Sequence, residues 1–200
     1  FDFDCASPNI IESKSLKLYL NSFNQSVFVN AEHVRQTLAD DLEAASGMCV
    51  QARIYAVADY QLKPANGFGC IDYLPVSCTL YQPEPALLTS NDTMVEEKLC
   101  SHLFRSLCPV TGQPDWASVF VTYSGRQIVA SSLLQYLVSF RNHQGFHEQC
   151  VEQIYLDIAR HCLPQQLTVY ARFMRRGGLD INPWRSSTLF LPENHRETRQ

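Results

Sequence analysis

One segment sets the architecture of this chain more clearly than any other: Trp116-Ala117-Ser118-Val119-Phe120-Val121-Thr122-Tyr123-Ser124-Gly125-Arg126-Gln127-Ile128-Val129-Ala130. Its first part, residues 116–123, is rich in β-branched and aromatic side chains and is typical of a strand. Ser124-Gly125 then predicts a turn, and residues 127–130 predict the returning strand. A β-hairpin is therefore expected in the C-terminal half.

The segments after this hairpin predict two helices and another strand. Helices are expected over residues 132–140 and 146–162, because apolar residues recur there at the helical spacing. The second helix would turn three side chains inward, those of Val151, Ile154 and Ile158. A strand is expected over residues 167–173, before the glycines that follow Arg176 break it.

Ahead of the hairpin, Val95, Leu99 and Leu103 recur every four residues and predict a helix. It would end at or before Cys108, because Pro109 comes next. The C-terminal half then runs helix, strand, strand, helix, helix, strand. This order favours an α+β fold in which paired helices cover one face of an antiparallel sheet.

The N-terminal part predicts two strands around one helix. Leucines alternate with other side chains over residues 15–21, which predicts a strand. A helix that Asn30 caps and Gly47 ends comes next. Residues 49–57 predict another strand, and the proline- and glycine-rich residues 59–92 predict a connection with some strand in it.

The composition is that of a packed globular protein and excludes several classes. The chain has 200 residues, of which 46% are hydrophobic. No apolar run is long enough to cross a bilayer, and residues 1–4 do not look like a signal peptide, so we expect a cytoplasmic protein without a membrane partner. The net charge of -4 argues against direct nucleic-acid binding.

Eight cysteines raise the question of disulfides or a metal site. No pair has CxxC spacing, and none has a histidine at zinc-finger distance. Without a secretion signal we expect reduced thiols, most of them buried as small apolar groups. The spacing therefore predicts no metal ligands.

The most reactive-looking segment is Cys108-Pro109-Val110-Thr111-Gly112-Gln113-Pro114-Asp115-Trp116. Its two prolines bracket a short loop that would join a helix to a strand. A thiol and a carboxylate held in one such loop can act as nucleophile and proton donor. The alternative, a buried cysteine beside a turn aspartate, stays open on the spacing alone.

Two further groups of polar residues are candidates for binding. His147 and Glu148 fall at the start of a predicted helix, where the helix dipole favours a carboxylate, and a carboxylate can accept two N–H donors side by side. Arg175-Arg176-Gly177-Gly178 could hold a phosphate through guanidinium groups and backbone amides. A surface pair and a charged turn are the alternatives. No Gly-x-Gly-x-x-Gly follows a strand, so the sequence does not support a Rossmann dinucleotide site.

Four segments together resemble the family of 7-cyano-7-deazaguanine reductases, the NADPH-dependent nitrile reductases of queuosine biosynthesis. The segment similar to the family's signature motif is Glu12-Ser13-Lys14-Ser15-Leu16-Lys17-Leu18-Tyr19. The others are Cys108 to Trp116, Phe140 to Cys150, and Arg175 to Trp184. They span nearly the whole chain in the family's order.

The resemblance implies the tunnelling fold in its longer form, with two fused modules that assemble by symmetry into a barrel. We expect the latter part of the first module over residues 1–70, a connection over 71–92 and the second module over 93–200. The first module's opening strands and helix are not evident, so we expect it to be incomplete at its N-terminus. A homo-oligomer, most simply a homodimer, is expected because such barrels need more than one module to close.

The resemblance also assigns roles to residues of this sequence. Cys108 would be the nucleophile and Asp115 the proton donor. The residues that would line the base are Ile11, Glu12, Ser13, His147 and Glu148. Those that would contact the cofactor NADPH are Ser13, Lys14, Arg176 and Gly177.

The implied reaction suits these residue types. The thiolate of Cys108 would attack the nitrile of 7-cyano-7-deazaguanine, and Asp115 would protonate its nitrogen to give a thioimide. Two NADPH would complete the reduction to the amine. A free thiol, with a pKa of about 8.5, needs a base or a lowered pKa for this attack.

Three alternatives remain open at the level of sequence. A zinc-dependent pterin-forming cyclohydrolase of the same fold would need a Cys/His ligand set, which the spacing does not supply. A tRNA-binding module of the same pathway would need a basic, aromatic surface. A cysteine amidase or nitrilase would hydrolyse the thioimide instead of reducing it, and the lysine and arginine groups suited to NADPH argue against this alternative.

Overall fold

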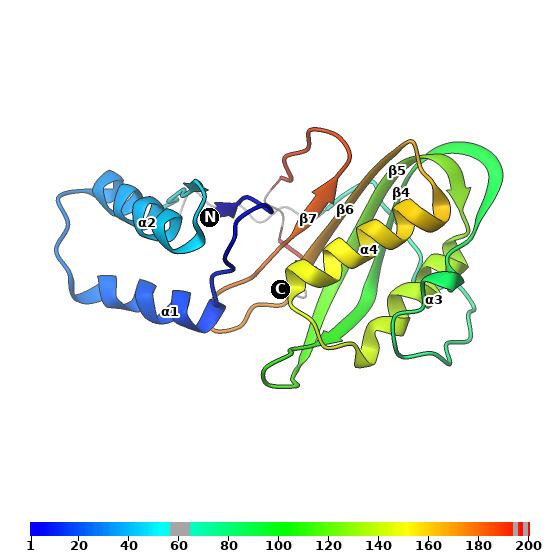
Figure 1. The fold of residues 1–200 in the computed structure, drawn as a ribbon, viewed down its shortest axis with the longest axis horizontal. Coiled ribbons are helices and arrows are strands. Elements are labelled where there is room, and N and C mark those ends of the chain that lie inside the picture. The colour runs from blue at the N-terminus through cyan, green and yellow to red at the C-terminus, as the bar shows by residue number, and fades with distance from the viewer. Residues whose placement is uncertain (57–64, 194–195, 198–199) are drawn as a thin grey trace. The chain divides into compact units, whose positions relative to one another are not determined.

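The computed structural model describes residues 1–56, 65–193, 196–197 and 200 (Figure 1). The chain forms two compact units, Phe1–Gln61 and Leu62–Gln200. Each unit has its own helices and its own sheet, so we describe them one at a time.

The first unit contains a small two-stranded sheet and two main helices. β1 (Asp2–Phe3) pairs antiparallel with β2 (Val50–Gln51). The helical elements are α1 (Ser13–Ser22), a 3₁₀ turn (Phe23–Gln25) and α2 (Ala31–Ser46). Of the strand predicted over residues 49–57, only β2 forms within the described part, and residue 57 lies outside it.

The strand predicted over residues 15–21 is wrong, because this segment forms helix α1. Glu12 caps the helix: its carboxylate accepts hydrogen bonds from the backbone N–H groups of Lys14 at 2.9 Å and Ser15 at 2.8 Å. Leucine and lysine are good helix formers, and no residue of α1 is buried. The alternating leucines therefore belong to an exposed helix and not to a strand with one buried face.

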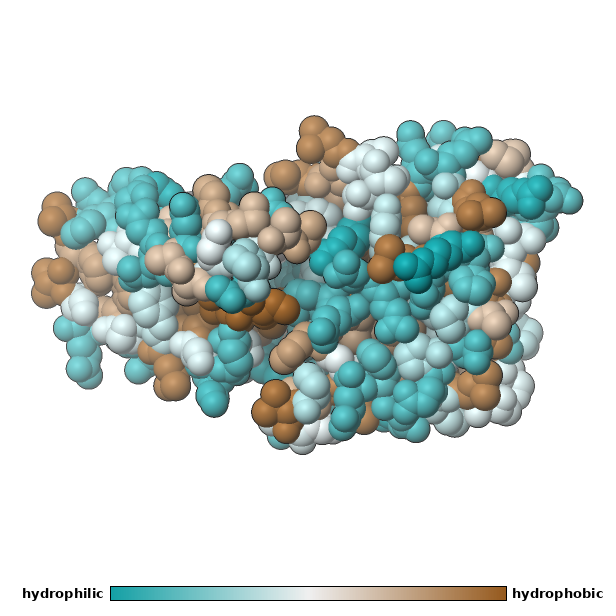
Figure 2. Space-filling view, in the orientation of Figure 1, coloured by the Kyte–Doolittle hydropathy of each residue, from teal (hydrophilic) through white to brown (hydrophobic). Residues whose placement is uncertain are grey.

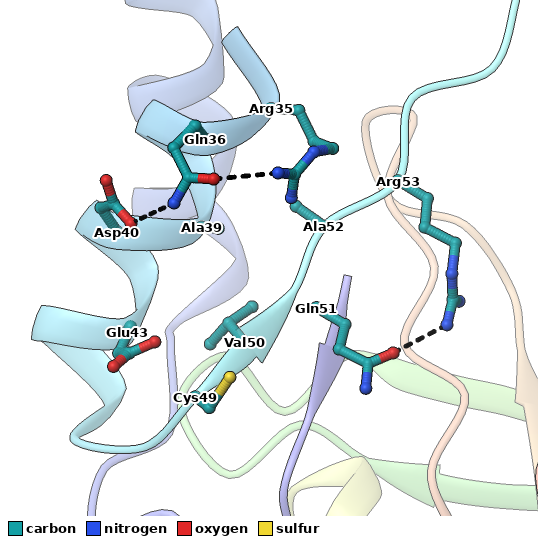
Figure 3. Close-up of a pocket in the computed structure, with 10 residues that line it drawn as sticks. All are labelled: Arg35, Gln36, Ala39, Asp40, Glu43, Cys49, Val50, Gln51, Ala52 and Arg53. Carbon is teal, nitrogen blue, oxygen red and sulfur yellow. Dashed lines mark hydrogen bonds between the residues drawn. The ribbon is translucent and has the colours of Figure 1, made fainter. Parts of the chain in front are cut away.

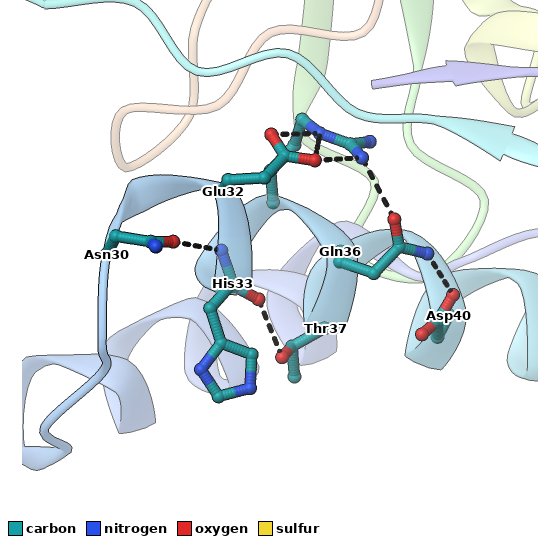
Figure 4. A network of polar contacts seen from close by, with 7 residues as sticks. Asn30, Glu32, His33, Gln36, Thr37 and Asp40 are labelled. Carbon is teal, nitrogen blue, oxygen red and sulfur yellow. Dashed lines mark hydrogen bonds and ion pairs between the residues drawn. The ribbon is translucent and has the colours of Figure 1, made fainter.

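Helix α2 confirms the predicted caps. The Asn30 side chain accepts a hydrogen bond from the His33 N–H at 2.8 Å, and Gly47 ends the helix with a φ of 84°. Its exposed side carries a chain of polar contacts in which Glu32 pairs with Arg35, and Gln36 donates to Asp40 (Figure 4).

The second unit is a five-stranded sheet with two helices. The strands, in sheet order, are β3 (Gly69–Cys70), β4 (Ser90–Leu107), β5 (Pro114–Ile128), β6 (Gln166–Phe173) and β7 (Trp184–Ser186). β3 runs parallel to β4, and all other neighbours are antiparallel. The helical elements are α3 (Ala130–Ser139), α4 (His147–Cys162) and 3₁₀ turns at Pro85–Leu87 and Phe140–Asn142.

The expected α+β class, with two helices against one face of a largely antiparallel sheet, is confirmed (Figure 1). One large core joins the helices to that face. It contains Phe104 of β4, Val119 of β5 and Val169 of β6, together with Leu137 of α3 and Ile154 of α4. The surface of the second unit on the side of these helices is mostly hydrophilic, with isolated apolar side chains (Figure 2).

Two predictions for this unit are wrong. The helix expected to end before Cys108 is the long strand β4, because Val95, Leu99 and Leu103 are also an even number of residues apart and so share one face of a strand. The hairpin expected at Ser124-Gly125, with its returning strand over residues 127–130, does not form either, because β5 runs straight through to Ile128 and α3 begins at Ala130. The hairpin partner of β5 is β4, which precedes it.

Gly125 therefore has a role other than a turn. Its φ is 138°, and a Cβ placed on it would lie 3.0 Å from the backbone of Pro164 and Gln165. The glycine allows the loop after α4 to approach the sheet closely. The remaining predictions for the unit, helices α3 and α4 and strand β6, are confirmed. Among the described residues, no helix is both long and apolar enough to span a membrane.

Candidate active site

The loop that carries Cys108 connects two strands, β4 and β5, instead of a helix and a strand. It is closed by two hydrogen bonds: the Cys108 N–H donates to the Gln113 carbonyl at 2.8 Å, and the Gly112 N–H donates to the Cys108 carbonyl at 2.9 Å. Gly112 has a φ of 67°, a conformation that favours glycine. The thiol is thus held on a tight turn at the end of the sheet.

The environment of Cys108 acts on its thiol in opposite directions. Burial raises the pKa, and so does the charge of Asp115, but hydrogen bonds from the Thr111 side chain and from the backbone amides of Thr111 and Val110 lower it more. The pKa of Cys108 therefore lies below the ordinary value. A thiolate is the nucleophilic form of cysteine, so this turn activates Cys108.

Asp115 lies at the start of β5, and its side chain is only 5% exposed. Its Oδ1 forms an ion pair with the Arg176 guanidinium at 2.5 Å and lies 3.4 Å from Nε2 of His147. The same Arg176 guanidinium donates to the Pro114 carbonyl at 3.2 Å. The carboxylate near the reactive thiol is thus bracketed by a cation and an imidazole.

His147 is fixed in this position by packing. Its ring stacks on Phe173 with centroids 3.8 Å apart and an interplanar angle of 6°. Its Nδ1 is buried without a hydrogen-bond partner in the part of the chain that the structure describes. Since a buried imidazole nitrogen normally has a partner, this atom is open to one from a bound molecule. Glu148 follows in the first turn of α4 and is partly exposed.

The segment before α4 is tied to the same end of β4. The Leu107 N–H donates to the His143 carbonyl at 2.8 Å, and the Gly145 N–H donates to the Leu107 carbonyl at 3.2 Å. These bonds fix the start of α4 beside the loop of Cys108. No sequence pattern predicts this tether or the stacking of Phe173 on His147, because both join residues far apart in the chain.

Arg176 and Gly177 lie in a turn after β6. The N–H groups of Arg176 and Leu179 each donate to the other residue's carbonyl, at 2.8 and 3.2 Å. Gly177 and Gly178 have positive φ values of 59° and 87°. The structure thus brings together Cys108, Asp115, His147 and Arg176. Glu148 follows His147 in the chain, and Gly177 follows Arg176.

The other four predicted binding residues, Ile11, Glu12, Ser13 and Lys14, lie in the first unit at the start of α1. The carboxylate of Glu12 caps helix α1. Hydrogen bonds from the Ser15 side chain and from the backbone of Lys14 lower the pKa of this carboxylate. Ile11 and Ser13 are partly buried, whereas Glu12 and Lys14 are exposed. These residues form a compact group within their own unit.

A surface pocket of the first unit does not coincide with any predicted site residue (Figure 3). It lies between α2 and β2 and is lined by Gln36, Glu43, Cys49 and Arg53, among others. Its lining is mixed in charge, and none of its described residues has a positive φ or a buried polar side-chain atom without a hydrogen-bond partner. The site at Cys108 is therefore the better candidate.

Comparison with known proteins gives matches over both units. A family model described as "Nitrile reductase, 7-cyano-7-deazaguanine-reductase N-term" matches residues 1–54, and one described as "QueF-like protein" matches residues 114–189. Among solved structures, the apo archaeosine synthase QueF-Like is similar, at 19% identity and a TM-score of 0.41. That match covers 48% of this chain and 95% of the other.

Proposed function

Because the chain belongs to the QueF family of 7-cyano-7-deazaguanine reductases, we propose that it reduces the nitrile of 7-cyano-7-deazaguanine to an aminomethyl group, with two NADPH consumed per base, as a step of queuosine biosynthesis. The observation that carries this proposal is the pairing of an activated thiol, Cys108, with the buried carboxylate of Asp115.

Cys108 is the nucleophile in this proposal. Its thiolate adds to the nitrile carbon, so a C–S bond forms while one π bond of the nitrile breaks. The nitrile nitrogen gains a negative charge and takes up one proton, which gives a covalent thioimide. The turn of residues 108–113 favours this step because its hydrogen bonds lower the pKa of the thiol.

Asp115 supplies the proton. The thiol must lose a proton and the nitrile nitrogen must gain one, so a single carboxylate close to both atoms can carry it from one to the other. Asp115 is close enough for its charge to act on Cys108, and its Oδ1 forms an ion pair with the Arg176 guanidinium. His147, 3.4 Å away, can hold or share the same proton through Nε2.

The base would lie against the start of α4. Glu148 offers two acceptor oxygens to the adjacent N–H donors of a guanine-like edge, and the helix dipole favours its charge. The buried Nδ1 of His147 is a second polar contact. Ile11, Glu12 and Ser13, which lie in the first unit, are the other residues that the family resemblance assigns to the base.

The residues assigned to NADPH suit an anionic dinucleotide. Lys14 and Arg176 are cations, Ser13 is a hydroxyl donor, and Gly177 leaves the backbone open beside Arg176. The Arg176 side chain is 38% exposed, so it can reach a phosphate as well as Asp115. When bound, NADPH supplies the two hydrides that reduce the thioimide and, after the thiolate leaves, the remaining imine.

The test is NADPH oxidation on addition of 7-cyano-7-deazaguanine, with products counted. We expect about two NADPH oxidised per amine formed, and no reaction in Cys108→Ala. Release of ammonia without NADPH oxidation would assign the site to a nitrilase instead. Turnover that Cys108→Ala retains would overturn the proposal.

A further inference from the structure

A group of soft metal ligands lies on the second unit, away from the site at Cys108. The thiols of Cys70 and Cys100 and the imidazole of His102 have donor atoms that all lie within 4.8 Å of one another. Cys70 of β3 is the register partner of Cys100 in the parallel pair with β4. Sequence spacing alone hides this group, because Cys70 joins it only through strand pairing.

The imidazole of His102 is oriented as a metal ligand would be. Its Nδ1 lies 2.7 Å from the hydroxyl of Ser118, a residue only 2% exposed on the neighbouring strand. Its Nε2 lies 4.0 Å from Sγ of Cys100. A hydrogen bond at one ring nitrogen fixes the tautomer and turns the other nitrogen toward the metal in most histidine-ligated sites.

The surroundings hold these ligands in place. Cys100 is buried, with 5% of its surface exposed. The carboxylate of Asp72 braces the strand that carries Cys100 and His102, because it accepts hydrogen bonds from the Ser101 hydroxyl at 2.7 Å and the His102 N–H at 3.0 Å. It also places a negative charge beside the ligands, which favours a cation.

We propose that Cys70, Cys100 and His102 bind one Zn²⁺ ion and that water takes the fourth position. Two thiolates and an imidazole suit zinc and exclude the oxygen-preferring Mg²⁺ and Ca²⁺. At Zn–S distances of about 2.3 Å, tetrahedral sulfurs lie roughly 3.8 Å apart, so the group needs to close by less than about 1 Å. The exposed side of Cys70 leaves the fourth position open to solvent.

In this position the ion would hold a short strand in place. β3 has only two residues, and an ion bound by Cys70 and Cys100 would link it to β4. Cys108 follows Cys100 by eight residues, about 26 Å along an extended strand. The ion therefore does not reach the reactive thiol, and the inference does not depend on the proposed nitrile reduction.

The test uses the full chain, purified under reducing conditions and stripped with a chelator. Zn²⁺ is titrated against a chromophoric competitor, and Co²⁺ is used as a spectroscopic probe. We expect one ion per chain and a thiolate-to-cobalt charge-transfer band. Cys70→Ser and His102→Gln should each weaken Zn²⁺ binding by more than about 100-fold, and Ser118→Ala by about 10- to 100-fold with the band retained.

Cys49→Ser is the matched control, because Cys49 is exposed like Cys70 and lies outside the group. It should bind zinc as the unmodified chain does. Circular dichroism of each metal-free variant separates lost ligands from lost folding. The proposal is overturned if the reduced chain binds no Zn²⁺, or if folded Cys70→Ser and His102→Gln bind it as tightly as the control does.

Discussion

At the residue scale, the reactivity of Cys108 depends on the balance of opposing effects on the pKa of its thiol. Burial raises the pKa, and hydrogen bonds from Thr111 and Val110 lower it by more. The Thr111 hydroxyl is the largest of the lowering contributions. This side chain is exposed, so a substitution of similar shape should leave the core intact.

Thr111→Val should therefore raise the pKa of Cys108. The substitution keeps the shape of the side chain but removes its O–H donor, so the thiolate loses a stabilising hydrogen bond. The pH midpoint of Cys108 alkylation, followed by peptide mass spectrometry, should move upward, and nitrile reduction should slow most at the lower pH values. Thr111→Ser keeps the donor and should behave as the unmodified chain does. An unchanged midpoint in Thr111→Val would refute this role.

Asp115→Asn should separate base binding from adduct formation. Asparagine keeps the size of the side chain but cannot carry the proton from thiol to nitrile nitrogen. General acid–base catalysis is typically worth about 10²- to 10⁴-fold in rate, and we expect a loss of that size in stopped-flow adduct formation without NADPH. Asp92→Asn, an exposed change elsewhere in the unit, is the control. Adduct formation by Asp115→Asn at the control rate would exclude Asp115 as the proton carrier.

The sequence predicts that two residues lie close together where they share one short loop. Cys108 and Asp115 could be paired in advance because both lie in one proline-bracketed segment. The stacking of His147 on Phe173 and the meeting of Cys70 with Cys100 could not, because strand pairing and helix packing create them. No local pattern reports such contacts.

At the element scale, the predictions held where local signals end an element. Asn30 and Gly47 bound α2, and apolar spacing identified α3 and α4. They failed where one spacing fits two structures. Residues 95–103 suit a helix or a strand face equally, and the leucine alternation of residues 15–21 also fits the helix that Glu12 caps.

The tether between β4 and α4 gives a prediction at this scale. A Cβ on Gly145 would lie 2.8 Å from Nε2 of His143 and 3.4 Å from Sγ of Cys150, so Gly145→Ala must displace His143. We expect lower thermal stability and a loss of nitrile reduction, because the start of α4 moves away from Cys108. Gly69→Ala, whose Cβ would meet only ordinary contacts at 3.6 Å, is the control. Equal stability and activity in both variants would show that the tether does not position the site.

At the scale of the whole molecule, α3 and α4 pack against one face of the sheet of the second unit. Its other face carries Cys100, Phe120 and Tyr170, with Phe68 and Trp184 packed beside them. The family resemblance implies barrels built from several modules, and we propose that the chain forms a homo-oligomer, most simply a dimer. Light scattering after size-exclusion chromatography should give at least twice the 22.8 kDa chain mass. A monomer at every concentration tested would contradict this.

The covalent bond between Cys108 and the nitrile is the central claim of the account, and mass spectrometry of the trapped adduct tests it most directly. The chain is mixed with 7-cyano-7-deazaguanine in the absence of NADPH, digested, and each cysteine peptide is weighed. We predict one base-sized mass increase on the peptide of Cys108, its absence in Cys108→Ala, and its loss on adding NADPH. An adduct on any other cysteine, or none on the unmodified chain while it turns over, would contradict the account.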